Sequence, residues 1–136
     1  MCCYVRDNSN SSVYAVSYEC EIMWLTFTFE VFAYYIAHSY YRPKSNYIAS
    51  ELCTELNKII NQINLTATSS DAIIIVADDF NQLNTSFLEI DHGLVQIVNS
   101  VTHWNNVLDR VYTNRLDMYS AHVLKSLINS RPNTWL

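Results

Sequence analysis

Hydrophobic and polar residues alternate through the first third of the chain. Residues 12–29 (SVYAVSYECEIMWLTFTF) predict one or two strands, and residues 31–41 (VFAYYIAHSYY) predict another. Both segments are rich in β-branched and aromatic residues, which favour extended backbone. Pro43 restricts its own backbone and that of Arg42, so the extended pattern is expected to end there.

The spacing of apolar residues then becomes helical. They recur every three or four positions, at Ile48, Leu52, Leu56, Ile59, Ile60 and Ile63. This period places them on one side of a helix. We therefore predict a long helix over residues 46–63, with Ser45 or Asn46 as its N-cap.

The second half of the chain combines short apolar segments. Residues 72–78 are apolar on both faces until the first carboxylate, which is typical of a central strand. Residues 85–93 predict a short helix that ends at its glycine. Further strands are expected at residues 94–98 and 107–113, while residues 120–128 fit either a helix or a strand. This mixture of elements indicates an α/β (α+β) fold.

The composition fits one domain or part of one. Half of the 136 residues are hydrophobic and 15% are charged, which excludes a disordered chain. The net charge of −5 provides no basic surface for nucleic acid. Gly93 is the single glycine, far below the usual share of about 7%. Since sheets normally use glycines in turns and bulges, this shortage indicates a drifted or truncated sequence.

The cysteines and the first residues predict an intracellular protein, nuclear or cytoplasmic, and not a secreted one. No metal-site or disulfide-framework spacing relates Cys2, Cys3, Cys20 and Cys53. The start, MCCYVRDNSNSS, lacks the basic and apolar segments of a signal peptide. Residues 22–37 are shorter than the roughly 20 residues that a bilayer requires, and they contain Glu30. No membrane segment is therefore expected.

The predicted central strand ends in the sequence IIIVADDFNQL, which presents Asp78, Asp79 and Asn81 together. These residues suit a polar turn, because Asp and Asn side chains bond to nearby backbone. They also suit a site at the end of a sheet, where α/β proteins place their chemistry. Side chains alternate along a strand, so Asp79 and Asn81 are expected to point the same way and Phe80 towards the core.

Two other predicted strands also carry polar side chains at comparable positions. Asp109 lies within the strand predicted at residues 107–113, where a carboxylate needs a partner or water. Tyr41 lies at the end of the strand before Pro43. Three strand ends that each carry a polar group predict a site on one rim of a sheet. The four histidines share no ligand-type spacing with a carboxylate, so structural roles are expected for His38, His92, His103 and His122.

These segments together resemble the endonuclease/exonuclease/phosphatase superfamily, specifically the apurinic-like endonuclease domain of non-LTR (LINE-type) retrotransposons. The similar segments occur in the same order and are CCYVRD, EIMWLTF, YYRPKSNY, IIIVADDFNQLN and VTHWNNVLDRVYTN. They span residues 2–117. The resemblance implies an α/β (α+β) sandwich of that superfamily, incomplete, with a partial domain at residues 1–119 and a divergent tail at residues 120–136.

The resemblance also implies roles for individual residues. Asp79 would orient or deprotonate an attacking water, and Asn81 would hold that water or the scissile phosphate. Asp109 would pair with a catalytic histidine and fix its tautomer. Tyr41, with Tyr40 as the alternative, would contact a phosphate oxygen. A substrate contact is implied for Thr102. The family reaction is Mg²⁺-assisted hydrolysis of a DNA phosphodiester.

The sequence also departs from the family pattern. It begins after the strands that supply an Asn and a metal-binding Glu, and nothing after Tyr119 matches the family's Ser-Asp-His segment. Asp78 stands where the family has Gly. The remaining carboxylates are not expected to assemble a Mg²⁺ shell, and the acidic charge opposes DNA binding. We expect a degenerate fragment, inactive as an isolated chain. The alternative is a non-catalytic α/β binding or interaction module of unknown partner.

Overall fold

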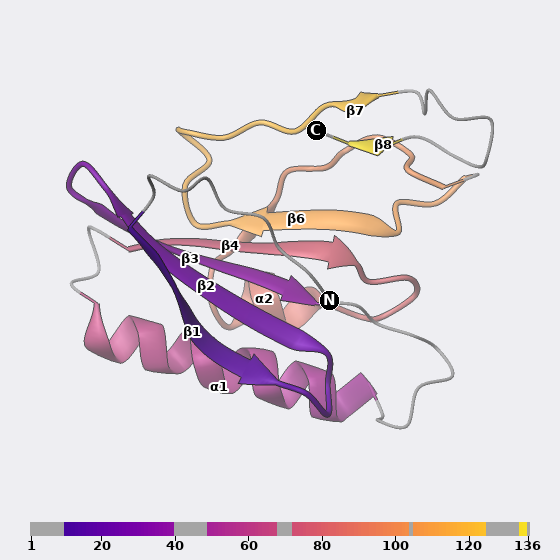
Figure 1. Ribbon diagram of the computed structural model, residues 1–136. Helices are drawn as coiled ribbons and strands as arrows, with labels where there is room; N and C mark the ends of the chain where they lie inside the picture. Colours follow the sequence, from indigo (N-terminus) through magenta and orange to yellow (C-terminus); the bar gives the residue numbers. More distant parts are fainter. Residues whose placement is uncertain (1–9, 40–48, 68–71, 104, 125–133, 136) are drawn as a thin grey trace.

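The structure, a computed structural model, describes residues 10–39, 49–67, 72–103, 105–124 and 134–135 (Figure 1). Six strands form one mixed sheet in the order β1-β2-β3-β4-β6-β5, and two further strands form a separate pair. The elements are β1 (Ser11–Ser17), β2 (Ile22–Phe29), β3 (Phe32–Ser39), α1 (Ala49–Thr66), β4 (Ala72–Asp79), α2 (Ser86–Ile90), β5 (Val95–Gln96), β6 (Asp109–Thr113), β7 (Val123–Leu124) and β8 (Thr134–Trp135). The predicted mixed α+β class is confirmed.

The apolar segment at residues 22–37 forms two adjacent antiparallel strands, as its alternation predicted. β2 and β3 pair along their whole length, from Ile22 opposite Ser39 to Phe29 opposite Phe32. β1 continues this meander on the other side of β2. Within the described residues, no helix has the length and apolar character needed to cross a membrane.

Helix α1 connects two parallel strands and packs on one face of the sheet (Figure 1). Leu52, Leu56, Ile60 and Ile63 are fully buried, so the helical period identified the correct side of the helix. They join the core cluster formed by strand residues such as Trp24. The predicted N-cap residues, Ser45 and Asn46, lie outside the described residues.

Strand β4 is central, between β3 on one side and β6 on the other. Ile74 and Val76 face the core under α1, and Ile73 is buried on the opposite face. A strand with both faces covered has to be apolar throughout, which explains the sequence AIIIVA. The prediction of a central strand at residues 72–78 is confirmed.

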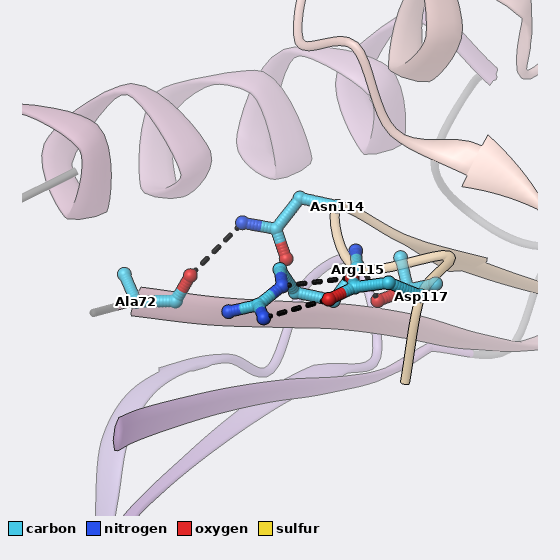
Figure 2. Close-up of polar contacts among 5 residues, drawn as sticks. Ala72, Asn114, Arg115 and Asp117 are labelled. Carbon is cyan, nitrogen blue, oxygen red and sulfur yellow. Dashed lines mark hydrogen bonds and ion pairs between the residues drawn. The ribbon is translucent and has the colours of Figure 1, made fainter. Parts of the chain in front are cut away.

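The side chain of Asn114 extends the β4–β6 pairing beyond the last residue of β6. Its Oδ1 accepts a hydrogen bond from the Ile74 N–H at 2.9 Å, and its Nδ2 donates to the Ala72 carbonyl at 2.9 Å. Figure 2 shows this amide above β4, next to the ion pair of Arg115 and Asp117 at 2.9 Å. The amide satisfies the β4 backbone where the partner strand has ended.

The short helix α2 is present as predicted, but it ends at Ile90 with Asp91 as its C-cap, before Gly93. Gly93 has φ +64° and donates its N–H to the Glu89 carbonyl at 3.1 Å, so a glycine in the left-handed region closes the turn that follows the helix. The tail is strand at Val123–Leu124, while residues 125–128 lie outside the described part. Tyr119 and Ala121 line a hollow of about 120 Å³ on the sheet face opposite α1. The boundary at residue 119 stays a prediction.

Candidate active site

Asp79 and Asp109 lie directly opposite each other in the sheet. Asp79 is the last residue of β4, Asp109 is the first residue of β6, and their Cα atoms are antiparallel partners. Partners of this kind project to the same face, with Cβ atoms about 4.5–5.5 Å apart. The two carboxylates expected on one rim are therefore brought together by backbone pairing alone.

The electrostatic environment of Asp79 favours its protonated form. Burial raises the pKa of Asp79, and the charges of Asp109 and Asp78 raise it further. The N–H of Asn81 and the charge of His103 lower the pKa and oppose this shift. The net result is a carboxyl group that holds its proton more tightly than an ordinary Asp.

The same carboxylate also forms a turn. Asp79 Oδ1 accepts a hydrogen bond from the Asn81 N–H at 3.0 Å, and Asn81 has φ +49°. This is an Asx turn with Asn in the left-handed region, which Asn tolerates better than most residues. Phe80 is fully buried, as predicted. The prediction that Asn81 continues the strand alternation is wrong, because β4 ends at Asp79.

Thr102 fixes the start of β6. Its side chain is fully buried, and its Oγ1 accepts hydrogen bonds from the N–H groups of Leu108 at 3.0 Å and Asp109 at 3.1 Å. The structure thus connects Thr102 to Asp109 through the backbone, with its hydroxyl oxygen directed at β6. Tyr41 and its alternative, Tyr40, lie outside the described residues.

Arg110 holds the loop that follows β4. Its guanidinium donates to the Leu83 carbonyl at 2.9 Å, to Thr85 Oγ1 at 2.7 Å and to the Asn81 carbonyl at 3.2 Å. Its Nε donates to the Val107 carbonyl at 3.2 Å. The sequence did not indicate this role, since three of the four acceptors are main-chain oxygens. Every residue has a main-chain carbonyl, so the spacing of side chains in the sequence cannot predict such hydrogen bonds.

His38 and Asp78 form an ion pair that the sequence interpretation missed. His38 Nδ1 lies 2.9 Å from Asp78 Oδ2, and Asp78 Oδ1 accepts the Asp79 N–H at 2.7 Å. The pKa of His38 is raised, because the hydrogen bond to Asp78 outweighs the lowering by partial burial. A signal was present, because His38 and Asp78 are each the penultimate residue of their strands. Parallel neighbours bring such positions to the same edge.

The described residues do not fit a magnesium shell. Across the part of the chain that the structure describes, no group of three or more His, Cys, Asp and Glu side chains converges as a metal would require. Mg²⁺ demands near-octahedral oxygen ligands, and the opposed pair of Asp79 and Asp109 supplies only two carboxylates.

Comparison with known proteins identifies no relative of this chain. No family model matches the chain, and no curated protein or solved structure is detectably similar to it. The resemblance to retrotransposon endonucleases therefore remains a hypothesis that rests on the sequence motifs.

Proposed function

We propose that this chain is a degenerate fragment of a retroelement-encoded phosphodiester endonuclease and is inactive as an isolated chain. The observation that carries the proposal is the direct pairing of Asp79 with Asp109. Groups that share a catalytic centre have to converge on one place. Two carboxylates from distant parts of the sequence do so here, at the strand ends that the family motifs identify.

Within this proposal, the two carboxylates have different tasks. Asp79, the last residue of β4, is the residue that would orient or deprotonate a water molecule. The turn at Asn81, which has left-handed backbone, fixes the main chain that follows Asp79. Asp109 is the residue that would orient an imidazole.

The proposed inactivity follows from the groups that the motifs lack. The sequence contains no Ser-Asp-His segment to supply the family histidine, and the described carboxylates do not form a shell for the Mg²⁺ that the resemblance implies. Catalytic groups act as a unit, so the loss of one member costs nearly as much as the loss of all.

The test is a plasmid-nicking assay in Mg²⁺ with two proteins. The 136-residue chain is expected to leave supercoiled DNA intact. A rebuilt protein, with the family's first strands and its Ser-Asp-His segment grafted on, is expected to nick. Asp79→Ala should abolish that nicking, while Asp91→Ala, at an exposed Asp after α2, should not.

The proposal fails if the rebuilt protein nicks equally well with Ala at residue 79. A second observation tests the ancestry separately: the genomic DNA on both sides of the reading frame can be translated. An upstream strand with Asn and Glu, a downstream Ser-Asp-His and then a reverse transcriptase would support it. Unrelated flanking sequence would count against it.

A further inference from the structure

Strand β1 is an outer strand with few of the features that normally protect a sheet edge. Its sequence, SSVYAVS, contains no charged residue and no proline, and Val13 and Val16 are 59% and 41% exposed. A bulge lies between Val13 and Ala15, but the pairing with β2 is regular from Ala15 to Ser17. Among the described residues, only β2 pairs with β1. Such an edge is a template for another strand.

Hollows flank both faces of this edge. The first, of about 340 Å³, lies between β1 and α1 and is lined by Ala15, Ser17 and Trp24 among others. Trp24 is 1% exposed, and no described residue accepts a hydrogen bond from its indole N–H. The second hollow, of about 470 Å³, is lined by Val13, Val16 and other residues around the edge. Side chains of an added strand alternate between faces and would enter both hollows.

The carboxyl-terminal end of β1 is acidic. Glu19, Glu51 and Glu55 line a further hollow of about 280 Å³ beside Cys20, and Glu55 also pairs with Lys58 at 3.4 Å, so the hollow carries more negative than positive charge. Burial raises the pKa of the Cys20 thiol, and the charges of these three glutamates raise it further. The three glutamates around the hollow thus make this end of the strand negative, which favours a cationic partner.

This potential also distinguishes between possible occupants. If a second copy paired antiparallel with β1, its residues 8–12 would lie near this acidic end. Their sequence, NSNSS, contains no basic residue. The overall charge of −5 further opposes association between copies. The complementary partner is a different protein segment that carries basic residues.

We propose that the outer edge of β1 binds an extended segment of a partner protein as an added antiparallel strand. The segment has apolar side chains that enter the hollows on the two faces, and Lys or Arg at its amino-terminal end. In the antiparallel orientation, that end reaches the hollow of Glu19, Glu51 and Glu55. Main-chain hydrogen bonds give affinity in this mode, and the hollows and charges give specificity. The inference does not depend on phosphodiester chemistry.

The probe is a synthetic peptide, KKVTVTVT, labelled with fluorescein at its carboxyl terminus and titrated with the full 136-residue chain. Fluorescence anisotropy should show saturable binding that weakens as salt rises. The peptide EEVTVTVT should bind at least about tenfold more weakly, because its acidic end meets the glutamates. The peptide N-methylated at alternate backbone nitrogens should not bind, because it cannot complete the ladder.

Protein variants assign the binding to β1. Val16→Lys should weaken binding of KKVTVTVT about tenfold, since a charged side chain on the edge blocks strand addition. Ile90→Lys, at a 79% exposed apolar residue on α2, should bind as the natural chain does. Glu19→Lys, at an exposed residue outside the core, should weaken binding of the basic peptide and strengthen that of the acidic one.

Three results would overturn the proposal. They are no saturable binding of KKVTVTVT, equal binding of the acidic peptide, and an undiminished affinity of Val16→Lys. If the chain is a dimer in sedimentation at the same concentrations and the peptide dissociates it, a second copy is the occupant and the proposal is wrong. Circular dichroism of each variant confirms that the fold is intact, and Glu19→Lys provides the result if Val16→Lys does not fold.

Discussion

The β4–β6 junction and the outer strand β1 belong to the same sheet but are held in contrasting ways. At the junction, Arg110 contacts main-chain carbonyls on both sides of the carboxylate pair, and Thr102 supports the backbone of Asp109. At β1, the described hydrogen bonds of Val13–Ser17 are those of one ladder, together with a contact from Cys20 to Ser17. Side chains hold the β4–β6 junction, whereas the outer edge of β1 has no partner strand among the described residues.

Under the proposed function, this difference explains how the junction would keep its geometry after its chemistry was lost. Asp79 and Asp109 face each other because β4 and β6 pair at that register. The loop after Asp79 keeps its shape because Arg110 binds its carbonyls. None of these interactions requires a substrate. A chain that lost catalysis would still retain them, since they also stabilise the fold. In contrast, the outer edge of β1 is not held by side chains in this way.

The largest expected effect is on the junction. Arg110→Met should lower the free energy of unfolding by about 2–4 kcal/mol, because it leaves partly buried carbonyls without their charged donor. Urea denaturation followed by tryptophan fluorescence measures this change. Arg115→Met, which removes the pair with Asp117 and the contact of the guanidinium with the Phe32 ring at 5.1 Å, should have a smaller effect, because both interactions lie near the surface. Equal effects of the two variants would show that the hydrogen bonds of Arg110 stabilise the junction no more than a surface ion pair does.

The mixed α+β class and the main elements were predictable from sequence, because the hydrophobic period of each element is local information. Alternation at residues 12–29 and the helical spacing at Leu52, Leu56 and Ile60 each describe one element and its buried side. The approach of Asp79 to Asp109 was also predicted, from polar residues on two predicted strands and from the order of the family motifs. The Asx turn at Asn81 was misjudged, because a local side-chain hydrogen bond ended the strand earlier than its alternation suggested.

The remaining features depend on which strands are neighbours, and the hydrophobic period of each element does not contain that information. His38 meets Asp78 only because β3 and β4 run parallel side by side. The hydrogen bonds of Arg110 depend on the path of a loop whose carbonyl groups are the same for every residue type. The exposure of β1 is likewise a property of strand order. Sequence periodicity describes elements, whereas these contacts arise between them.

An intermediate effect is expected from pH at the carboxylate pair. Because the pKa of Asp79 is raised in the folded state, its ionised form destabilises that state. The stability contribution of protonated Asp79 is present below its ordinary pKa and is lost as pH rises through its folded pKa. Asp79→Asn keeps an oxygen to accept the Asn81 N–H. It should therefore raise the melting temperature at pH 7, with a gain that shrinks towards pH 3.

Thermal melts of Asp91→Asn at pH 3 and pH 7 provide the control, because this exposed Asp follows α2 and is not part of the Asp79–Asp109 pair. Its melting temperature should follow that of the natural chain at both pH values. A gain for Asp79→Asn that is the same at pH 3 and pH 7 would show that the charge of Asp79 is not the cause. A loss at pH 7 would show that the ionised carboxylate stabilises the junction instead.

The smallest expected effect is at the outer strand. Val16→Lys should change the free energy of unfolding by less than about 0.5 kcal/mol, because the side chain is 41% exposed and makes no described hydrogen bond. The same urea titration that detects Arg110→Met measures it. A cost as large as that of Arg110→Met would show that Val16 is covered within the chain itself. The outer edge of β1 would then be occupied internally, and a partner strand would have no place to bind.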